Sequence, residues 1–222
     1  MRNRRGLFAG MQSGRLSGFV PYKGTKDLPN AGRISRFIRN FVDMKVALCQ
    51  FSMEWEAAAR NLRRAEELVA QAGADLALLP EMFATGFVTE PWRTALPDEE
   101  ELLAWMRRTA RRYATALAGS AVVRSGDRFA NRFFFVRPAG GAERYDKRHL
   151  FSIGGEDAHF VAGRRRVVVE YGGLRFLPLV CYDLRFPVWC RCRSDYDAIL
   201  CVASWPAPRR EVWRTLLRAR AI

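Results

Sequence analysis

The sequence FLPLVCYDLRFP, residues 176–187, carries the clearest indication of fold and chemistry in this chain. Its first five residues are apolar and predict a buried strand that ends at Cys181, and Pro187 prevents the strand from continuing. In α/β enzymes the end of a strand, where the chain turns into a loop, is a common position for a nucleophile. Unpaired cysteines are more often simply buried in the core. This stretch alone therefore leaves both interpretations of Cys181 open.

Composition places the chain among globular proteins that can bury a sizeable core. Of its 222 residues, 49% are hydrophobic and 27% are charged, which argues against wholesale disorder. No apolar run approaches the roughly 18 residues that a membrane span requires, so we expect no membrane association. The five cysteines are an odd number without the spacing of a secreted disulfide framework. They favour reduced thiols and a cytoplasmic location.

The formal net charge of +14 is compatible with a nucleic-acid partner, but its distribution argues against one. Residues 1–43 hold nine Lys and Arg against two acids, a net +7, so residues 44–222 carry the other +7. Most arginine pairs in the larger part are dispersed, and we interpret them as solvated surface. The triplet Arg164-Arg165-Arg166 lies in a predicted loop. There it is either solvated surface or a contact for an anionic substrate or partner.

Residues 1–43 form a separate segment that is not expected to contribute to a core. They are rich in Arg, Gly and Ser, contain no acid before Asp27 and show little apolar periodicity. An Arg-rich, acid-poor composition is typical of a mitochondrial presequence, but the long amphipathic helix is missing. We favour a disordered tail, or a start assigned too far upstream with Met44 as the working start, over targeting to the mitochondrial matrix. The folded domain is therefore expected to span 44–222.

From Met44 onward the pattern alternates strands with helices, which predicts an α/β fold with helices covering the faces of a sheet. The predicted strands cover residues 45–51, 75–80, 120–123, 132–136, 166–171, 174–180 and 198–203. The predicted helices run from Trp55 to Gly73, from an N-cap at Asp98 to Gly119, and from Arg209 to Ile222 with Val212, Leu216 and Ala219 on one side. The interval from Tyr145 to Arg165 is predicted to be a long loop, and loops of that length in compact domains tend to be functional.

Three reactive side chains each follow a predicted strand directly. They are Glu81 after residues 77–80, Lys147 after the short run Glu143-Arg144-Tyr145-Asp146, and Cys181 after residues 177–180. Because the carboxyl ends of strands in an α/β sheet converge on one crevice, these groups could meet despite their separation in sequence. A carboxylate that takes a thiol proton, a thiolate that attacks a carbonyl and an ammonium that stabilises the oxyanion form a workable set for acyl transfer. An exposed Glu, an exposed Lys and a core Cys remain an equal alternative on pattern alone.

Three segments resemble the nitrilase superfamily of carbon–nitrogen hydrolases, and within it the omega-amidase branch. They are LLPEMF at 78–83, YDKRHLF at 145–151 and VCYDLRFP at 180–187, and the resemblance extends from Met44 to Ile222. It implies a four-layer α-β-β-α sandwich. It also implies that Glu81 is the general base and acid, that Lys147 stabilises the oxyanion and that Cys181 is the nucleophile. Glu156 matches a second glutamate that orients the lysine and the substrate in this superfamily.

The resemblance further implies an activity that needs no metal and no cofactor. The expected substrate is the terminal amide of an α-keto dicarboxylate monoamide, such as 2-oxoglutaramate, which is hydrolysed through a cysteine thioester. Other small amides, such as deaminated glutathione or an N-carbamoyl compound, are the alternative within the fold, because Ser204 stands where bacterial omega-amidases more often carry Asn. A basic binding module without catalysis is the alternative from another class, which the intact Glu, Lys and Cys disfavour.

The remaining candidates concern the substrate pocket and its surroundings. Four aromatic residues could line the acyl pocket, namely Phe83, Phe87, Tyr182 and Trp205, and the backbone N–H of Tyr182 would complete the oxyanion hole. Arg185 is either a structural ion-pair partner, which we favour, or a contact for a substrate carboxylate. His149 is expected to support the lysine loop through a hydrogen bond. Cys190 and Cys192 fit no usual zinc spacing with the two histidines.

The end of the chain leaves the alternation of strands and helices unfinished. Members of the superfamily continue past the position of Ile222 with further strands and a segment used in subunit contacts. On that resemblance we expect the chain as written to be C-terminally incomplete and poorly stable, because sheet edges would be exposed. The full-length protein is expected to form a homodimer.

Overall fold

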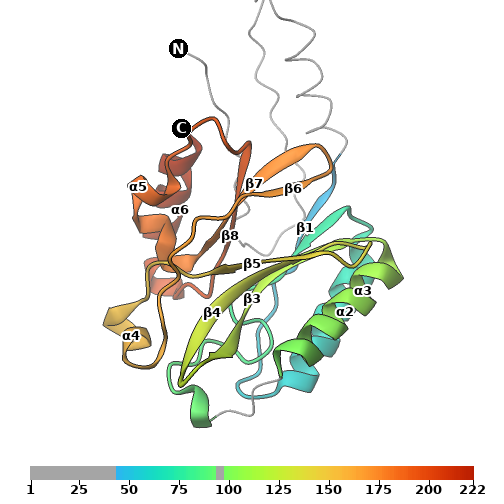
Figure 1. Cartoon of the computed structure of the whole chain (residues 1–222), viewed down its shortest axis with the longest axis horizontal. Coiled ribbons are helices and arrows are strands. Elements are labelled where there is room, and N and C mark those ends of the chain that lie inside the picture. The colour runs from blue at the N-terminus through green and yellow to red at the C-terminus, as the bar shows by residue number, and fades with distance from the viewer. Residues whose placement is uncertain (1–43, 94–97) are drawn as a thin grey trace, which may run out of the picture.

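The computed structural model of the chain describes residues 44–93 and 98–222, and the expectations for the segment 1–43 lie outside the described residues. Two β-sheets lie face to face (Figure 1). The first has five strands in the order β1 (Val46–Leu48), β2 (Leu76–Leu78), β3 (Ala116–Ser125), β4 (Arg128–Val136) and β5 (Ala142–Asp146). The second has three strands in the order β6 (Val169–Tyr171), β7 (Leu174–Val180) and β8 (Ala198–Val202).

Strand direction brings several strand ends to the same edge of each sheet. In the larger sheet β1, β2 and β3 are parallel, and β4 runs antiparallel to both β3 and β5. The strands β2, β3 and β5 therefore point the same way. In the smaller sheet β7 is parallel to β8 and antiparallel to β6. Glu81 follows β2, Lys147 follows β5 and Cys181 follows β7, each just after its strand ends.

Helices cover the outer faces of both sheets. The long helices α2 (Ala58–Ala72) and α3 (Glu99–Tyr113) lie against the five-stranded sheet, while α5 (Pro187–Cys190) and α6 (Arg210–Ala221) lie on the side of the three-stranded sheet (Figure 1). The short helix α4 (Glu156–His159) and four 3₁₀ segments occupy the connections. These segments are Pro91–Arg93, Ser152–Gly154, Cys181–Arg185 and Ala207–Arg209. The order of layers is helix, sheet, sheet, helix, as the resemblance to the nitrilase superfamily implies.

The alternation of side chains along β4 shows how one strand serves two apolar clusters. Phe133 and Phe135 join the cluster between the sheets, where the ring of Phe135 stacks on Phe176 of β7 with centroids 6.5 Å apart. Phe134 and Val136 point the other way, into the cluster beneath α2 and α3. Burial on both faces explains why this strand reads as a nearly continuous apolar run. Burying such phenylalanine side chains stabilises the fold by about 1.5–3 kcal/mol each.

The two long helices form where the sequence predicts them, but their ends differ. Asp98 caps α3, since its carboxylate accepts the N–H of Glu100 at 3.0 Å. The helix ends at Tyr113 rather than at Gly119, because Ala114 takes a left-handed conformation with φ of 50° and its N–H bonds to the carbonyls of Ala110 and Arg111. The prediction that helical spacing continued as far as Leu117 is therefore wrong: Leu117 lies in β3.

Three other boundaries correct the sequence prediction. Trp55 precedes α2 and is 63% exposed, because the helix begins at Ala58. The predicted long loop is shorter, since Tyr145 belongs to β5 and residues 156–159 form α4. In α6 the buried side chain is Trp213, whereas Val212 on the predicted apolar side is exposed. No helix among the described residues is both long enough and apolar enough to cross a membrane.

Candidate active site

Lys147 lies between two carboxylates in a fully buried cluster. Its Nζ is 2.9 Å from Oε1 of Glu81 and 2.8 Å from Oε2 of Glu156, and all three side chains are 0% exposed. Burial by itself would lower the pKa of Lys147, but the charges of Glu81 and Glu156 outweigh it and raise the pKa above its ordinary value. At neutral pH the side chain is therefore a protonated ammonium, and the two carboxylates hold it in place.

Backbone contacts position the lysine. The N–H of Lys147 donates to the carbonyl of Asn131 in β4 at 2.9 Å, and its own carbonyl accepts the N–H of Gly163 at 2.8 Å. A Cβ at Gly163 would lie 2.0 Å from the carbonyl oxygen of Asp146, so only glycine allows this approach. The strand β5 and the segment around Gly163 thus hold Lys147 from both sides.

Asn131 joins the two carboxylates. Its Nδ2 donates to Oε1 of Glu81 at 2.9 Å and to Oε1 of Glu156 at 3.0 Å, and the side chain is 0% exposed. Its Oδ1 is buried without a hydrogen-bond partner among the described residues. The remaining oxygen of Glu81, Oε2, accepts the backbone N–H of Ser204, just after β8, at 2.8 Å. Phe151 donates its backbone N–H to Oε2 of Glu156 at 2.6 Å.

Cys181 begins the 3₁₀ turn that follows β7. It is 8% exposed and has φ of 47°, a left-handed conformation that is uncommon for a residue other than glycine and that stores strain. Burial and the charge of Glu81 raise the pKa of its thiol well above the ordinary value, against the lowering effect of Lys147. At neutral pH the thiol therefore keeps its proton and needs an adjacent base, which Glu81 can supply.

Asp183 ties the turn at Cys181 to the end of β5, which precedes Lys147. Its Oδ2 accepts the N–H of Val180 at 3.0 Å and the hydroxyl of Tyr145 at 2.7 Å. Its Oδ1 lies 2.8 Å from Nδ1 of His149 and accepts the backbone N–H of the same histidine at 2.9 Å. The His149 ring also stacks on Phe186 with centroids 3.7 Å apart. The buried carboxylate thus fixes the end of β7 relative to the residues that flank Lys147.

The predicted pocket residues fall into two groups. Tyr182 and Trp205 lie together, because the guanidinium carbon of Arg185 is 5.8 Å from the centroid of each ring. Phe87 lies beside the charged cluster, with its ring centroid 5.9 Å from Nζ of Lys147. Phe83 is elsewhere: it is 0% exposed in the cluster between β3 and α3, where its ring faces Trp105. Its backbone N–H donates to the carbonyl of Ser120 at 3.0 Å, and its side chain belongs to a different apolar cluster from that of Cys181.

Among the described residues, Arg185 does not form the structural ion pair that the sequence favours. The described part of the chain contains no ion pair of this residue, and its Nε is buried without a hydrogen-bond partner. The guanidinium is instead held against the faces of Tyr182 and Trp205. A second guanidinium, that of Arg209, lies 5.9 Å from the ring of Trp205 and 6.0 Å from the ring of Phe151. Two cations therefore flank the same aromatic side chain.

The sequence did not single out Asn131, Asp183 or Arg209. Asn131 stands in the run Phe129–Val136, where one uncharged polar residue within an apolar strand is the available signal. Asp183 stands two residues after Cys181, in the stretch that predicts the fold. Among the described residues, no group of three or more His, Cys, Asp or Glu side chains is arranged to hold a metal ion.

The fold and the cluster define a class of enzyme, and comparison with known proteins agrees. The family model described as carbon-nitrogen hydrolase matches residues 45–222. The chain therefore belongs to the carbon–nitrogen hydrolases of the nitrilase superfamily, and it is a hydrolase that acts on amides. The superfamily and the sandwich that the sequence predicts are confirmed.

Relatives of known name lie in one branch. The chain is 47% identical over 180 residues to "Omega-amidase YafV" of Yersinia enterocolitica, which covers 81% of this chain and 70% of the relative. It is 30% identical over 184 residues to "2-oxoglutaramate amidase" of Bacillus subtilis, with 80% and 71% covered. The crystal structure of a CN-hydrolase superfamily protein from Xanthomonas campestris, which has an arsenic adduct in its active site, matches with a TM-score of 0.76 at 40% identity, covering 81% of this chain and 71% of that one.

Proposed function

We propose that this protein is an omega-amidase that hydrolyses the terminal amide of 2-oxoglutaramate or a close analogue to the dicarboxylate and ammonia. The observation that carries the proposal is the buried cluster in which Lys147 contacts both Glu81 and Glu156, together with the influence of the Glu81 carboxylate on the pKa of the buried Cys181 thiol. The names of the relatives supply the substrate class: omega-amidase in one, 2-oxoglutaramate amidase in another.

Acylation starts from a neutral thiol. Glu81 takes the proton of Cys181 as the sulfur adds to the amide carbonyl carbon, so that a C–S bond forms while the carbonyl becomes an oxyanion. The ammonium of Lys147 and the backbone N–H of Tyr182 stabilise that oxyanion. Collapse of the tetrahedral species breaks the C–N bond, and Glu81 returns its proton to the leaving nitrogen. Ammonia departs, and an acyl thioester remains on Cys181.

Deacylation uses the same groups. Glu81 is again a carboxylate and takes a proton from a water molecule as that water adds to the thioester carbonyl. Lys147 and the Tyr182 N–H stabilise the second oxyanion, the C–S bond breaks, and the thiolate regains the proton that Glu81 holds. Glu156 keeps the ammonium in place throughout, because it accepts from Lys147 at 2.8 Å without facing the thiol chemistry. Removing one oxyanion donor costs about 10²–10³ in rate in comparable sites.

Recognition of a substrate with a free carboxylate is assigned to Arg185. Its Nε is buried and unpaired in the described part of the chain, and its guanidinium is held by Tyr182 and Trp205. An unpaired donor of this kind is costly to bury unless a ligand accepts from it. A carboxylate at the far end of a short dicarboxylate monoamide provides that acceptor, and guanidinium geometry suits it. Trp205 and Phe87 would then border the acyl chain.

The decisive experiment measures ammonia release from 2-oxoglutaramate by the protein and by its Cys181→Ala variant. We expect the variant to lose activity by at least about 10³-fold, since no group remains to form the thioester. Deaminated glutathione and an N-carbamoyl amino acid serve as comparison substrates and should react more slowly. Equal rates for protein and variant would contradict the nucleophile assignment, and a preference for either comparison substrate would contradict the substrate assignment.

A second variant tests the carboxylate contact separately. Arg185→Gln should raise KM for 2-oxoglutaramate about tenfold or more, because losing about 1.4 kcal/mol of binding free energy weakens affinity tenfold. It should leave kcat/KM for an uncharged short amide within a factor of about three, since that substrate has no carboxylate to bind. Arg209→Gln, which removes the other guanidinium that lies against Trp205, is the matched control. The assignment fails when both variants weaken the two substrates equally.

A further inference from the structure

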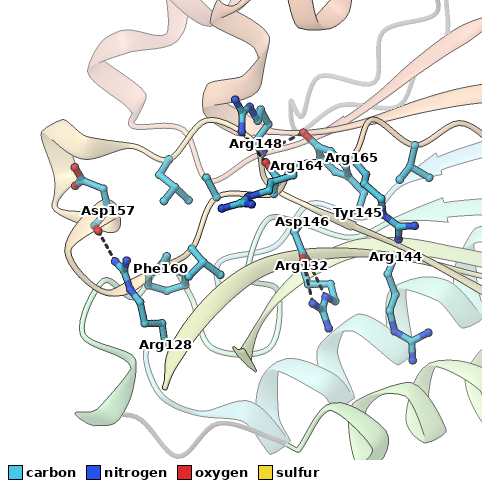
Figure 2. Close-up of a pocket in the computed structure, with 15 residues that line it drawn as sticks. Arg128, Arg132, Arg144, Tyr145, Asp146, Arg148, Asp157, Phe160, Arg164 and Arg165 are labelled. Carbon is cyan, nitrogen blue, oxygen red and sulfur yellow. Dashed lines mark hydrogen bonds and ion pairs between the residues drawn. The ribbon is translucent and has the colours of Figure 1, made fainter. Parts of the chain in front are cut away.

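A cleft of about 810 Å³ is bordered by the start of β4, the end of β5 and residues 160–167, and neither Cys181 nor Lys147 lines it (Figure 2). Its lining is dominated by arginine. Six arginines line it, namely Arg128, Arg132, Arg144, Arg148, Arg164 and Arg165, against two acids, Asp146 and Asp157. Two of the six belong to the Arg164-Arg165-Arg166 triplet of the sequence. The volume lies within the range of small-molecule sites in proteins, about 300–1,000 Å³.

Two of these arginines already have carboxylate partners. Arg132 makes a bidentate contact with Asp146, at 2.6 and 2.9 Å, and also reaches Glu99 at 2.8 Å. Arg144 contacts the other oxygen of Glu99 at 2.8 Å. These contacts join β4 and β5 to the first turn of α3. Their charges are largely neutralised, so they form the floor of the cleft rather than a free cationic surface.

The other four arginines are not neutralised within the described residues. Arg128 donates to the backbone carbonyl of Asp157 at 2.6 Å, and Arg148 donates to that of Gly163 at 3.1 Å. A carbonyl satisfies a donor but does not cancel its charge. Arg164 and Arg165 are exposed and make no ion pair or hydrogen bond there. In Figure 2 the side chain of Arg164 extends toward the Arg128 end of the cleft and that of Arg165 toward the Arg144 end. Even with Asp157 counted, a surplus of positive charge runs along the cleft.

From this arrangement we propose that the cleft binds a small oligophosphate, recognised through its phosphate groups. Successive guanidinium groups along a groove match successive phosphates, and each planar fork can bind phosphate oxygens in pairs. The lining offers no exposed aromatic surface for stacking, because its aromatic side chains, Tyr145 and Phe160, are 2% and 1% exposed. A nucleobase would therefore gain little here, and the phosphate chain supplies the binding energy.

The cleft is separate from the amidase site although the two share a wall. Asp146 and Arg148, which line the cleft, flank Lys147 in sequence, but the ammonium of Lys147 points into the buried cluster with Glu81 and Glu156. A ligand in the cleft would contact the outer side of this segment and would not reach Cys181. Binding there should consequently be independent of the nucleophile.

The test is a calorimetric titration of the protein with sodium tripolyphosphate at low and at physiological ionic strength. We expect saturable 1:1 binding that weakens as salt rises, since the contacts are exposed and charged. The double variant Arg164→Glu, Arg165→Glu should weaken binding by at least about tenfold. The control Arg63→Glu, Arg108→Glu changes the net charge equally at exposed positions on α2 and α3 that lack ion pairs in the described residues, and should bind as the parent does.

Three further arms separate the alternatives. Cys181→Ala should bind tripolyphosphate unchanged, and citrate, a tricarboxylate, should bind more weakly than tripolyphosphate. Absence of saturable binding, or equal weakening in the two double variants, would overturn the proposal. A single-stranded oligonucleotide that binds more tightly than tripolyphosphate, and loses that binding in the Arg164/Arg165 variant, would also overturn it, because the surface would then be a nucleic-acid site.

Discussion

Each buried charge of the active-site cluster has a partner. One ammonium, that of Lys147, faces two carboxylates, and the amide of Asn131 supplies a further N–H to each carboxylate. Burying a charge without such partners costs several kcal/mol, and removing one partner of a buried pair typically costs 3–5 kcal/mol. The members of the cluster therefore depend on one another, and in the proposed mechanism Glu81 acts as a base from a position that Lys147, Asn131 and the Ser204 N–H fix.

Asn131 gives the first prediction at this scale, since its amide contacts both Glu81 and Glu156. Asn131→Leu removes two hydrogen bonds to charged groups, each of which contributes about 1.5–3 kcal/mol to stability. We expect kcat to fall about 10- to 100-fold while KM changes less than threefold, and the unfolding midpoint in urea to fall as well. Steady-state kinetics with 2-oxoglutaramate and urea denaturation measure the two effects.

Asn131→Asp distinguishes this role from simple packing. It has nearly the same shape but places a third carboxylate beside Glu81 and Glu156, so like-charge repulsion should reduce activity and stability more than the leucine variant does at neutral pH. Stability of the aspartate variant should recover in part on acidification, when a carboxylate can be protonated. If the aspartate variant instead retains parental kinetics, the amide N–H groups have no positioning role.

The sequence predicts some active-site residues well and others poorly for a physical reason. Glu81, Lys147 and Cys181 each stand directly after a strand, and reactive groups at such positions are recognisable from pattern. Asn131 lies inside β4, where the partner that makes it functional is a carboxylate fifty residues away. Phe83 is the last residue of the segment 78–83, but the turn that follows β2 places its side chain in the helix-side core. Neither fact follows from local pattern.

The boundary between α3 and β3 shows what limits prediction at the scale of elements. Apolar spacing continues without a break from Met106 through Leu117, and no glycine or proline marks the end of the helix. The chain turns instead at Ala114, whose left-handed conformation is a feature of the folded state that the sequence does not announce. Gly73, in contrast, ends α2 at the predicted position with φ of 51°, because glycine favours that conformation.

Ala114 carries the prediction at this scale. A left-handed conformation costs an L-residue with a Cβ about 1–2 kcal/mol and costs glycine little, so Ala114→Gly should stabilise the protein by about 0.5–1 kcal/mol after the loss of chain entropy is counted. Ala104→Gly, the same chemical change inside α3, should destabilise it by about 0.5–1 kcal/mol. Urea denaturation of both variants measures the opposite signs, and a destabilising Ala114→Gly would contradict this account of the helix end.

At the scale of the molecule, the layer order was accessible while the division of strands between sheets was not. Alternating strands and helices predict an α/β fold, and the family motifs predict the sandwich. Pairing of β5 with β4 in one sheet and of β6 with β7 in the other depends on hydrogen bonds between strands, which local propensity does not determine. Four of the five thiols are buried in these layers: Cys49, Cys181, Cys190 and Cys201.

Because these thiols are buried, we expect the free energy of unfolding to fall at alkaline pH. Burial raises the pKa of Cys49 and of Cys190 to about 11, and raises those of Cys181 and Cys201 well above the ordinary value of 9.0. Between pH 9 and 11 the unfolded chain releases these protons and the folded protein keeps them, so the free energy of unfolding falls as pH rises, by at most about 1.4 kcal/mol per pH unit for each thiol. Below pH 9 the stabilisation by the protonated thiols is fully present.

Urea denaturation under reducing conditions at pH 8, 9, 10 and 11 should show the decline in the free energy of unfolding, and Cys49→Val should make that decline shallower. A free energy of unfolding that stays level across this range would show that the thiols are solvated in the folded protein.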